Sequence, residues 1–320
     1  MADNKRLGEK LTSFAMELWR EGMQTVWILF RITIPVIIIT KLFTELGLIV
    51  FLTGILEPVM GIMGLPGELG LVWATGMITT IYGALAVFAS LAPSLDLTAA
   101  QVTVLGGILL IAHSLPVELG ISKKAGAPIL PILFLRLGGA VVYGTALAFL
   151  CRYCKIWQEP AVIYFKETAQ DTNLLAWAGA QLVNLGMMVA VIFAILLAMK
   201  ILQSAGIIGL LEKMLNPVLP WFGMSSRAAP MTVVGMLIGL SYGGALIIRE
   251  TTLGKLGRNE IFNSMALMAL CHALIEDTLL MIAIGGMLAG LLFGRIIFAL
   301  AVTFLIARLV SRFLQTGNKG

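Results

Sequence analysis

Charged residues are scarce in this sequence. Asp, Glu, Lys and Arg make up 12% of the 320 residues, against about 25% in an average soluble domain. Hydrophobic residues make up 59%. This imbalance excludes an ordinary soluble protein and predicts an integral membrane protein whose main partner is the lipid bilayer. The net charge of +5 is too small to indicate a nucleic-acid partner.

Cysteine and histidine are also rare, with three cysteines and two histidines. Cys151 and Cys154 form one C-x-x-C pair without a second, which favours two small residues at a helix end over a redox or zinc site. The sequence has no nucleophile-and-base pattern, zincin motif or phosphate-binding loop. We therefore predict no catalytic residue, no cofactor and no metal site, and we expect that the chain is not an enzyme.

Residues Met1–Gln24 carry charges throughout and lack the apolar core of a cleavable signal peptide. Leu7, Leu11, Phe14 and Leu18 recur at spacings of four, three and four residues. This pattern predicts an amphipathic helix on the membrane surface, and its basic end favours the cytoplasmic face.

The sequence contains an internal duplication with an offset of 159 residues, the separation of His113 and His272 (272 − 113 = 159). Other matching residues of types rare in membrane segments are Lys41 with Lys200, Pro58 with Pro217, and Arg136 with Arg295. Tyr82-Gly83 matches Tyr242-Gly243 after a one-residue insertion. We predict an all-α membrane protein divided into an interfacial helix and tail (1–26), a first repeat (27–152), a polar linker and amphipathic helix (153–185), a second repeat (186–312) and a C-terminal tail (313–320).

Each repeat is expected to contain about three spanning helices and one glycine-interrupted apolar stretch. The predicted spans are Trp27–Ile49, Ala100–Leu119 and Ala127–Leu150, then Met188–Gly209, Ile261–Met281 and Met287–Leu309. The interrupted stretch Leu69–Leu91 fits one span or a re-entrant hairpin of two half-helices. Basic loops fall on one side only if the stretch is re-entrant, which favours two inverted repeats with both termini in the cytoplasm of a bacterial inner membrane.

Polar residues accompany the glycines at the two interruptions. Inverted repeats with broken helices are typical of secondary transporters, which bind their cargo where half-helices meet. The candidate binding residues at these tips are Thr79, Thr80, Tyr82 and Gly83 in the first repeat, and Ser241, Tyr242, Gly243 and Gly244 in the second. The alternative is that the glycines only permit close helix packing.

The two histidines lie in matching motifs at the ends of apolar runs. His113 and Glu118 are five residues apart with Pro116 between them, so we expect an unwound turn there. His272 and Glu276 are four apart, which would place them on one helix face beside Asp277. A histidine beside a carboxylate could relay protons or coordinate a cation. A polar cap at the membrane interface is the alternative.

Several further residues are candidates for structural or gating roles. Arg136 and Arg295 lie deep in the last helix of each repeat, where pairing with Glu118 or with Glu276 and Asp277 competes with snorkelling. Arg249 and Glu250 follow the second tip and could form a mouth or a solvated pair. Pro58 and Pro217 are expected to set turns.

The sequence resembles the nucleoside-recognition, or Gate-domain, family of bacterial membrane proteins, as two such domains in tandem. The resemblance rests on Leu215-Asn216-Pro217, on Ser241–Ile248 and on His272–Asp277, with echoes at Leu56-Glu57-Pro58 and His113–Glu118. Relatives of this family include concentrative nucleoside transporters, the ferrous-iron permease and spore-maturation membrane proteins. The resemblance implies membrane transport but names no substrate.

Three functions remain open from the sequence. The first is a proton- or ion-coupled secondary carrier that works by alternating access on a small polar solute, with a nucleoside-like solute as one option. The second is a divalent-cation permease using the histidines and nearby acids, although only Cys271 adds a soft ligand. The third is a non-transport factor in envelope or spore maturation. A homo-oligomer or a second membrane subunit is open as a partner.

Overall fold

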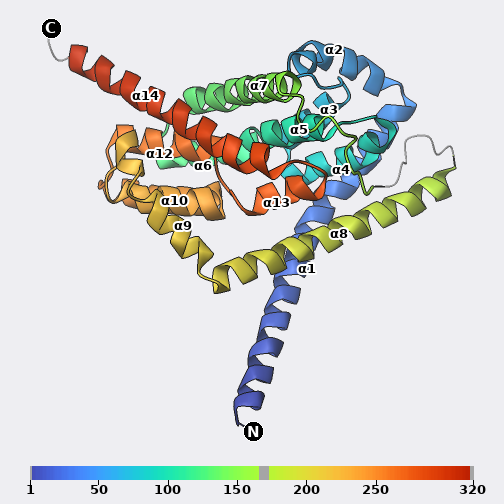
Figure 1. The fold of residues 1–320 in the computed structure, drawn as a ribbon, viewed down its shortest axis with the longest axis horizontal. Helices are drawn as coiled ribbons and strands as arrows, with labels where there is room; N and C mark the ends of the chain where they lie inside the picture. The colour runs from blue at the N-terminus through green and yellow to red at the C-terminus, as the bar shows by residue number, and fades with distance from the viewer. Residues whose placement is uncertain (1, 166–172, 318–320) are drawn as a thin grey trace.

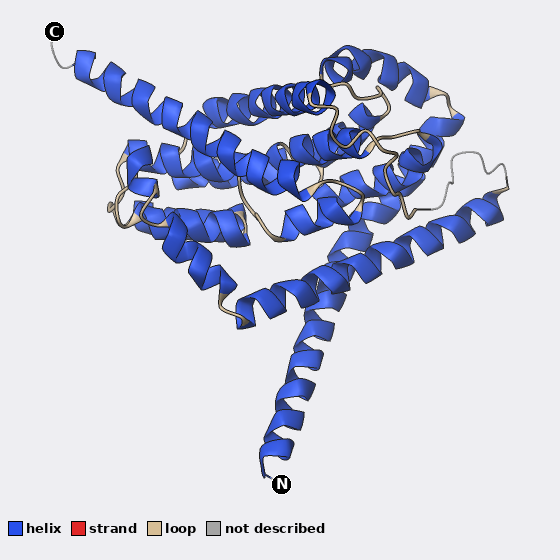
Figure 2. Ribbon diagram, in the orientation of Figure 1, coloured by secondary structure: helices blue, strands red, loops and turns tan. Residues whose placement is uncertain are grey.

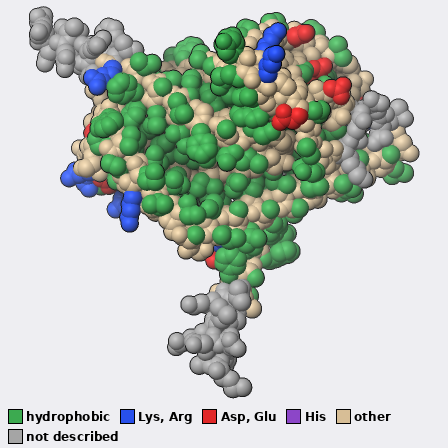
Figure 3. Space-filling model, in the orientation of Figure 1, with side chains coloured by type: hydrophobic (Ala, Val, Ile, Leu, Met, Phe, Trp, Pro, Cys, Tyr) green, Lys and Arg blue, Asp and Glu red, His purple; other side chains and the backbone are tan. Residues whose placement is uncertain are grey.

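The computed structural model describes residues 2–165 and 173–317. Within those ranges the chain is built from helices and contains no β-strand (Figures 1 and 2). Hydrophobic side chains cover the middle of the face in Figure 3, while acidic side chains gather near α2 and most basic ones lie at the opposite end. Among the described residues, five helical segments are long and apolar enough to cross a bilayer, and one of them, Ala99–Ala125, includes the break between α5 (Ala99–Ile111) and α6 (Leu115–Ala125). These features confirm the predicted all-α membrane protein.

The helices of the two halves correspond one to one in chain order. The first half contains α1 (Ala2–Glu45), α2 (Leu48–Ile62), α3 (Leu69–Ile78), α4 (Ile81–Leu91), α5 (Ala99–Ile111), α6 (Leu115–Ala125) and α7 (Ile129–Tyr153). The second contains α8 (Leu174–Ser204), α9 (Ile207–Leu215), α10 (Ala228–Ile238), α11 (Leu240–Thr252), α12 (Arg258–Leu270), α13 (Glu276–Ala283) and α14 (Arg295–Gly317), with a π-helical turn at Ala289–Gly294 before α14. Subtracting 159 from the bounds of α12 gives those of α5, so the structure repeats at the sequence offset.

Each half begins with one long helix where the sequence predicts two elements. α1 is continuous from Ala2 to Glu45 and projects from the helical body (Figure 1), so no break separates an interfacial helix from the first span. α8 likewise merges the predicted amphipathic helix with its span. The predicted breaks are absent because the amphipathic and apolar segments are both helical and no helix-breaking sequence separates them. The side chains of residues 1–11, which carry part of the amphipathic pattern, lie outside the described residues, as do 166–172 of the linker and 318–320 of the tail.

The glycine-interrupted stretches form hairpins of two half-helices. A Cβ built on Gly243 would lie 2.4 Å from the Cα of Gly235, although eight residues separate them in the chain. Such an approach requires α10 and α11 to turn back on each other at Gly239, whose φ of 136° suits only glycine. In the first half, Gly76 and Ala84 approach each other in the same way across the α3–α4 break. Helices of 10 to 13 residues reach only about 15–20 Å, which fits the re-entrant prediction.

Two of the predicted spans are broken at the histidines, and two others, Trp27–Ile49 and Met188–Gly209, run past the ends of α1 at Glu45 and α8 at Ser204. The span predicted over Ala100–Leu119 is divided into α5 and α6, and that over Ile261–Met281 into α12 and α13. The breaks fall at the histidines, and Ser114 and Ala273 take left-handed backbone conformations with φ of 48° and 44°. Hydrophobic length alone predicts one continuous helix across each break. It misses the unwinding because contacts with other segments of the fold stabilise the unwound turns.

Candidate functional site

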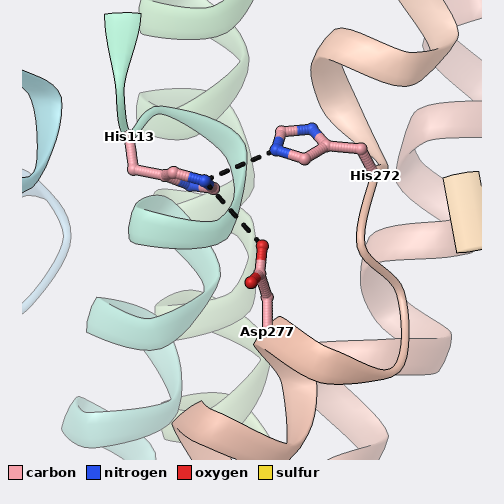
Figure 4. Close-up of side chains that lie close together, drawn as sticks. All are labelled: His113, His272 and Asp277. Atoms are coloured by element: carbon pink, nitrogen blue, oxygen red, sulfur yellow. Dashed lines mark hydrogen bonds and ion pairs between the residues drawn. The ribbon is translucent and has the colours of Figure 1, made fainter. Parts of the chain in front are cut away.

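The two broken helices bring His113 and His272 together, although they are 159 residues apart (Figure 4). Their Nε2 atoms are 3.4 Å apart, and both residues are almost completely buried, at 5% and 2% exposed. One imidazole comes from each repeat, so the site lies at the junction of the two halves.

The hairpins hold the two unwound segments in place. The backbone N–H of Ser114 donates to the carbonyl of Gly76 in α3, over 2.8 Å. The N–H of Leu274 donates to the carbonyl of Met236 in α10, also over 2.8 Å. Backbone groups freed by unwinding must find partners inside a membrane, and the hairpins supply them in both repeats.

The imidazole rings are oriented by backbone carbonyls. Nδ1 of His113 lies 2.8 Å from the carbonyl oxygen of Leu109, and Nδ1 of His272 lies 2.7 Å from that of Met268. A carbonyl oxygen only accepts hydrogen bonds, so each Nδ1 carries the hydrogen. In the neutral rings, both Nε2 atoms therefore present lone pairs toward each other.

Two carboxylates face the same point. Oε1 of Glu118 lies 3.4 Å from Nε2 of His113 and 3.3 Å from Nε2 of His272. Oδ2 of Asp277 lies 3.8 Å from Nε2 of His113. Nitrogen lone pairs and ionised carboxylates are all acceptors, so this cluster needs a positively charged or hydrogen-donating species at its centre.

Two fully buried arginines surround the cluster. Arg136 forms an ion pair with Oε2 of Glu118, and its Nε donates to the carbonyl of Ile111 over 2.8 Å. Arg295 donates to the carbonyl of His272 over 3.1 Å and reaches that of Leu110 at 3.5 Å. Both arginines thus bond to groups inside the bundle. Arg136 pairs with Glu118 as predicted, whereas Arg295 bonds to backbone carbonyls in place of the predicted Glu276 and Asp277.

The predicted alignment of His272 and Glu276 on one helix face is wrong. His272 lies in the break and Glu276 is the first residue of α13, so no helix turn aligns them. Instead, the hydroxyl of Tyr82 donates to Oε1 of Glu276 over 3.4 Å, which links the first hairpin tip to the second repeat. The unwound turn predicted between His113 and Glu118 is present.

The other tip residues serve mainly the hairpins. Thr80 caps α4 by accepting from the N–H of Gly83 at 3.3 Å, and the Thr79 hydroxyl donates to the carbonyl of Thr75 at 2.7 Å. Ser241 and Tyr242 are exposed, Tyr242 at 66%, whereas both histidines are buried.

The glycines of the tips permit close packing. A Cβ on Gly243 would meet the backbone of Gly235, one on Gly244 would meet Ile121, and one on Gly83 would meet the Thr79 hydroxyl. These contacts fit the packing alternative rather than direct ligand binding.

The four remaining candidate residues are Arg249, Glu250, Pro217 and Pro58. Arg249 and Glu250 are in the last turn of α11, about 15 Å along the helix from its start, and Glu250 pairs with Lys255 at 3.4 Å. Pro217 follows the end of α9 as expected. Pro58 lies inside α2, where the sequence predicted a turn.

The sequence did not reveal that the two histidines meet or that Glu118 contacts both. The equal offset of His113/His272 and Glu118/Asp277 was the available signal, because matched residues near a pseudo-symmetry axis can meet there. Periodicity along one helix could not show it.

One curated protein resembles the chain over most of its length. The Bacillus subtilis (strain 168) protein described as "Uncharacterized membrane protein YvoD" is 27% identical over 292 residues, covering 89% of this chain and 91% of its own. Comparison with protein-family models found no match, and no solved structure matches. The relative supports a membrane protein.

Proposed function

We propose that this protein is a membrane carrier that binds and transports a cation at the junction of its two repeats. The observation that carries the proposal is the convergence of four acceptor groups, one imidazole and one carboxylate from each half. Lone pairs and negative charges at this spacing repel one another in a low-dielectric interior. A bound cation turns that repulsion into attraction.

The charges of the surrounding residues also favour a cation. When ionised, Glu118, Glu276 and Asp277 contribute three negative charges, and Arg136 and Arg295 contribute two positive ones (2 − 3 = −1). With neutral imidazoles and all three carboxylates ionised, the cluster and its surroundings carry one excess negative charge. The acceptor atoms nearly touch across the site, which suits an ion better than the nucleoside-sized solute also considered from the sequence.

The architecture supports transport rather than static binding. Each half-site sits on a broken helix held by its own hairpin, so a movement of one repeat against the other would change the site and its access. Transporters built from inverted repeats with broken helices use this plan. The Gate-family resemblance favours the same class.

The inverted arrangement predicts the sidedness of individual loops. With both termini in the cytoplasm of a bacterial inner membrane, Arg258 faces the cytoplasm and Asp96 faces outward. Single cysteines at 96 and 258, in a variant lacking the native cysteines, should label from opposite sides of intact cells. Labelling of both from one side would contradict inverted repeats.

Reconstituted vesicles test transport directly. Uptake of Mn²⁺, Fe²⁺, Zn²⁺ and protons should be measured with the purified protein and with Glu118→Gln and Asp277→Asn. We expect uptake of at least one cation, lost in both variants and retained in Glu57→Gln and Asp96→Asn, which change exposed acids away from the cluster. Absence of cation uptake, or uptake unaffected by the two cluster variants, would contradict the proposal.

A further inference from the structure

We infer that the central cluster is a binding site for one divalent first-row transition-metal ion. The ligands are Nε2 of His113, Nε2 of His272, and the carboxylates of Asp277 and Glu118. Suitable atoms of His113, His272 and Asp277 all lie within 4.8 Å of one another (Figure 4). Glu118 adds an oxygen near both imidazoles.

The spacing of the acceptors matches a tetrahedral ion. Ligand bonds of about 2.0–2.1 Å to zinc place neighbouring ligands about 3.3–3.4 Å apart in a tetrahedron. The three separations among Nε2 of His113, Nε2 of His272 and Oε1 of Glu118 are 3.4, 3.4 and 3.3 Å. Oδ2 of Asp277 lies farther out, 3.8 Å from Nε2 of His113, so it must move inward to reach the spacing of a tetrahedral set.

The groups behind the ligands are those of a metal site. Metal-bound histidines usually donate their second ring N–H to a carbonyl or carboxylate, which fixes the tautomer and leaves the other nitrogen free. Leu109 and Met268 provide these carbonyls in the two repeats. Arg136 occupies Oε2 of Glu118 and leaves Oε1 directed at the imidazoles.

The ligand set also selects the class of ion. Mg²⁺ and Ca²⁺ prefer six or more oxygen ligands, whereas imidazole suits zinc, iron, nickel and copper, and carboxylate also suits manganese. Two imidazoles with two carboxylates therefore favour Zn²⁺, Fe²⁺ or Mn²⁺ over the alkaline-earth ions. The role of this ion as cargo rests on the proposed function, but its binding can be measured without transport.

The experiment is metal binding by the purified full chain in detergent. Equilibrium dialysis with Zn²⁺ should give one ion per chain, undisplaced by excess Mg²⁺. Co²⁺ should show the intense visible absorption of tetrahedral coordination. His113→Gln and His272→Gln should each weaken Zn²⁺ binding at least about 10-fold, because losing even a residue that only supports a ligand weakens metal binding about 10- to 100-fold. Asp96→Asn should bind like the original chain.

If a histidine variant fails to fold, the Co²⁺ spectrum of the original chain still tests the metal site. Absence of stoichiometric Zn²⁺ binding, displacement by Mg²⁺, or full binding in both folded histidine variants would overturn the metal site. Proton uptake without metal binding would overturn this inference alone and leave a cation carrier. Metal binding without uptake of any cation would overturn the proposed function and leave the metal site.

Discussion

In the first repeat, the guanidinium of Arg136 forms a buried ion pair with Glu118, whereas in the second repeat Arg295 contacts the backbone carbonyls of His272 and Leu110. Within the described part of the chain, Arg295 forms no ion pair with Asp277. The two halves thus share helices, breaks and histidines but support their carboxylates differently. Glu118 pairs with an arginine of its own repeat and contacts both histidines, while Asp277 contacts His113 of the other repeat.

This difference suggests how the halves divide the work. Glu118 is anchored by Arg136 of its own repeat, whereas the polar contact of Asp277 is with His113 of the other repeat. The two hairpins also differ. The hydroxyl of Tyr82 in the first hairpin donates to Glu276 across the junction, whereas the matching Tyr242 in the second hairpin is exposed.

Removing each arginine gives the largest expected effect. Arg136→Met leaves the buried Glu118 carboxylate without its partner and should cost about 3–5 kcal/mol of stability. Arg295→Met removes hydrogen bonds to carbonyls and should cost about 1–3 kcal/mol. Thermal unfolding in detergent would compare the two. Equal losses would show that the ion pair does not distinguish the repeats.

Substituting the hairpin glycines is expected to give the next largest loss of stability. Gly243→Ala forces a methyl group against the backbone of Gly235 and the sulfur of Met268, so it should cost about 2–3 kcal/mol. Gly83→Ala meets first the hydroxyl of Thr79, a side chain that can rotate, and should cost about 1 kcal/mol. The same unfolding measurement applies. A larger loss at Gly83 would contradict the packing account.

Removing the side-chain hydrogen bonds at the start of a helix is expected to give the smallest loss of stability. Oxygens of Glu260, at the loop end of α12, accept from the N–H groups of Ser225 and Gly257 at 3.0 and 2.8 Å. Partial burial opposes the charge, but these hydrogen bonds outweigh it and lower the pKa of Glu260. A lowered pKa stabilises the fold above the unfolded-state value of about 4.3, and this stability is lost as the pH falls.

Glu260→Gln should therefore cost about 0.5–1 kcal/mol at neutral pH, with the difference shrinking below about pH 4.3. The neutral cap of α5, where the N–H of Thr98 donates to Gln101 at 3.0 Å, provides the comparison. Gln101→Ala should cost a similar amount at all pH values. Unfolding curves across pH would detect the contrast, and a pH-independent cost at Glu260 would refute it.

The sequence was sufficient to predict the helical membrane class, the 159-residue repeat and the interrupted stretches, because hydrophobicity and rare residues carry that information. It also identified His113, Glu118, His272 and Asp277 individually. It could not show which side chains converge, since the His113–His272 contact depends on how two broken helices pack. The prediction of no metal site rested on the shortage of soft ligands, and the contact between the two imidazoles, on which the proposed metal site depends, is a product of tertiary structure.

Errors in the sequence analysis occurred where tertiary contacts override local pattern. Apolar length predicted unbroken spans through His113 and His272, but carbonyls of the hairpins stabilise the unwound turns. The one-face argument for His272 and Glu276 assumed a helix that ends at Leu270.

X-ray absorption of the zinc-loaded protein tests most directly whether a cation is bound between the two histidines. We expect nitrogen and oxygen atoms bound to the zinc ion at about 2.0–2.1 Å, together with the outer scattering of two imidazoles. Replacing either histidine with Gln should leave one imidazole. A sulfur shell at about 2.3 Å, implicating Cys271, or a shell without imidazole would contradict a site shared by both repeats.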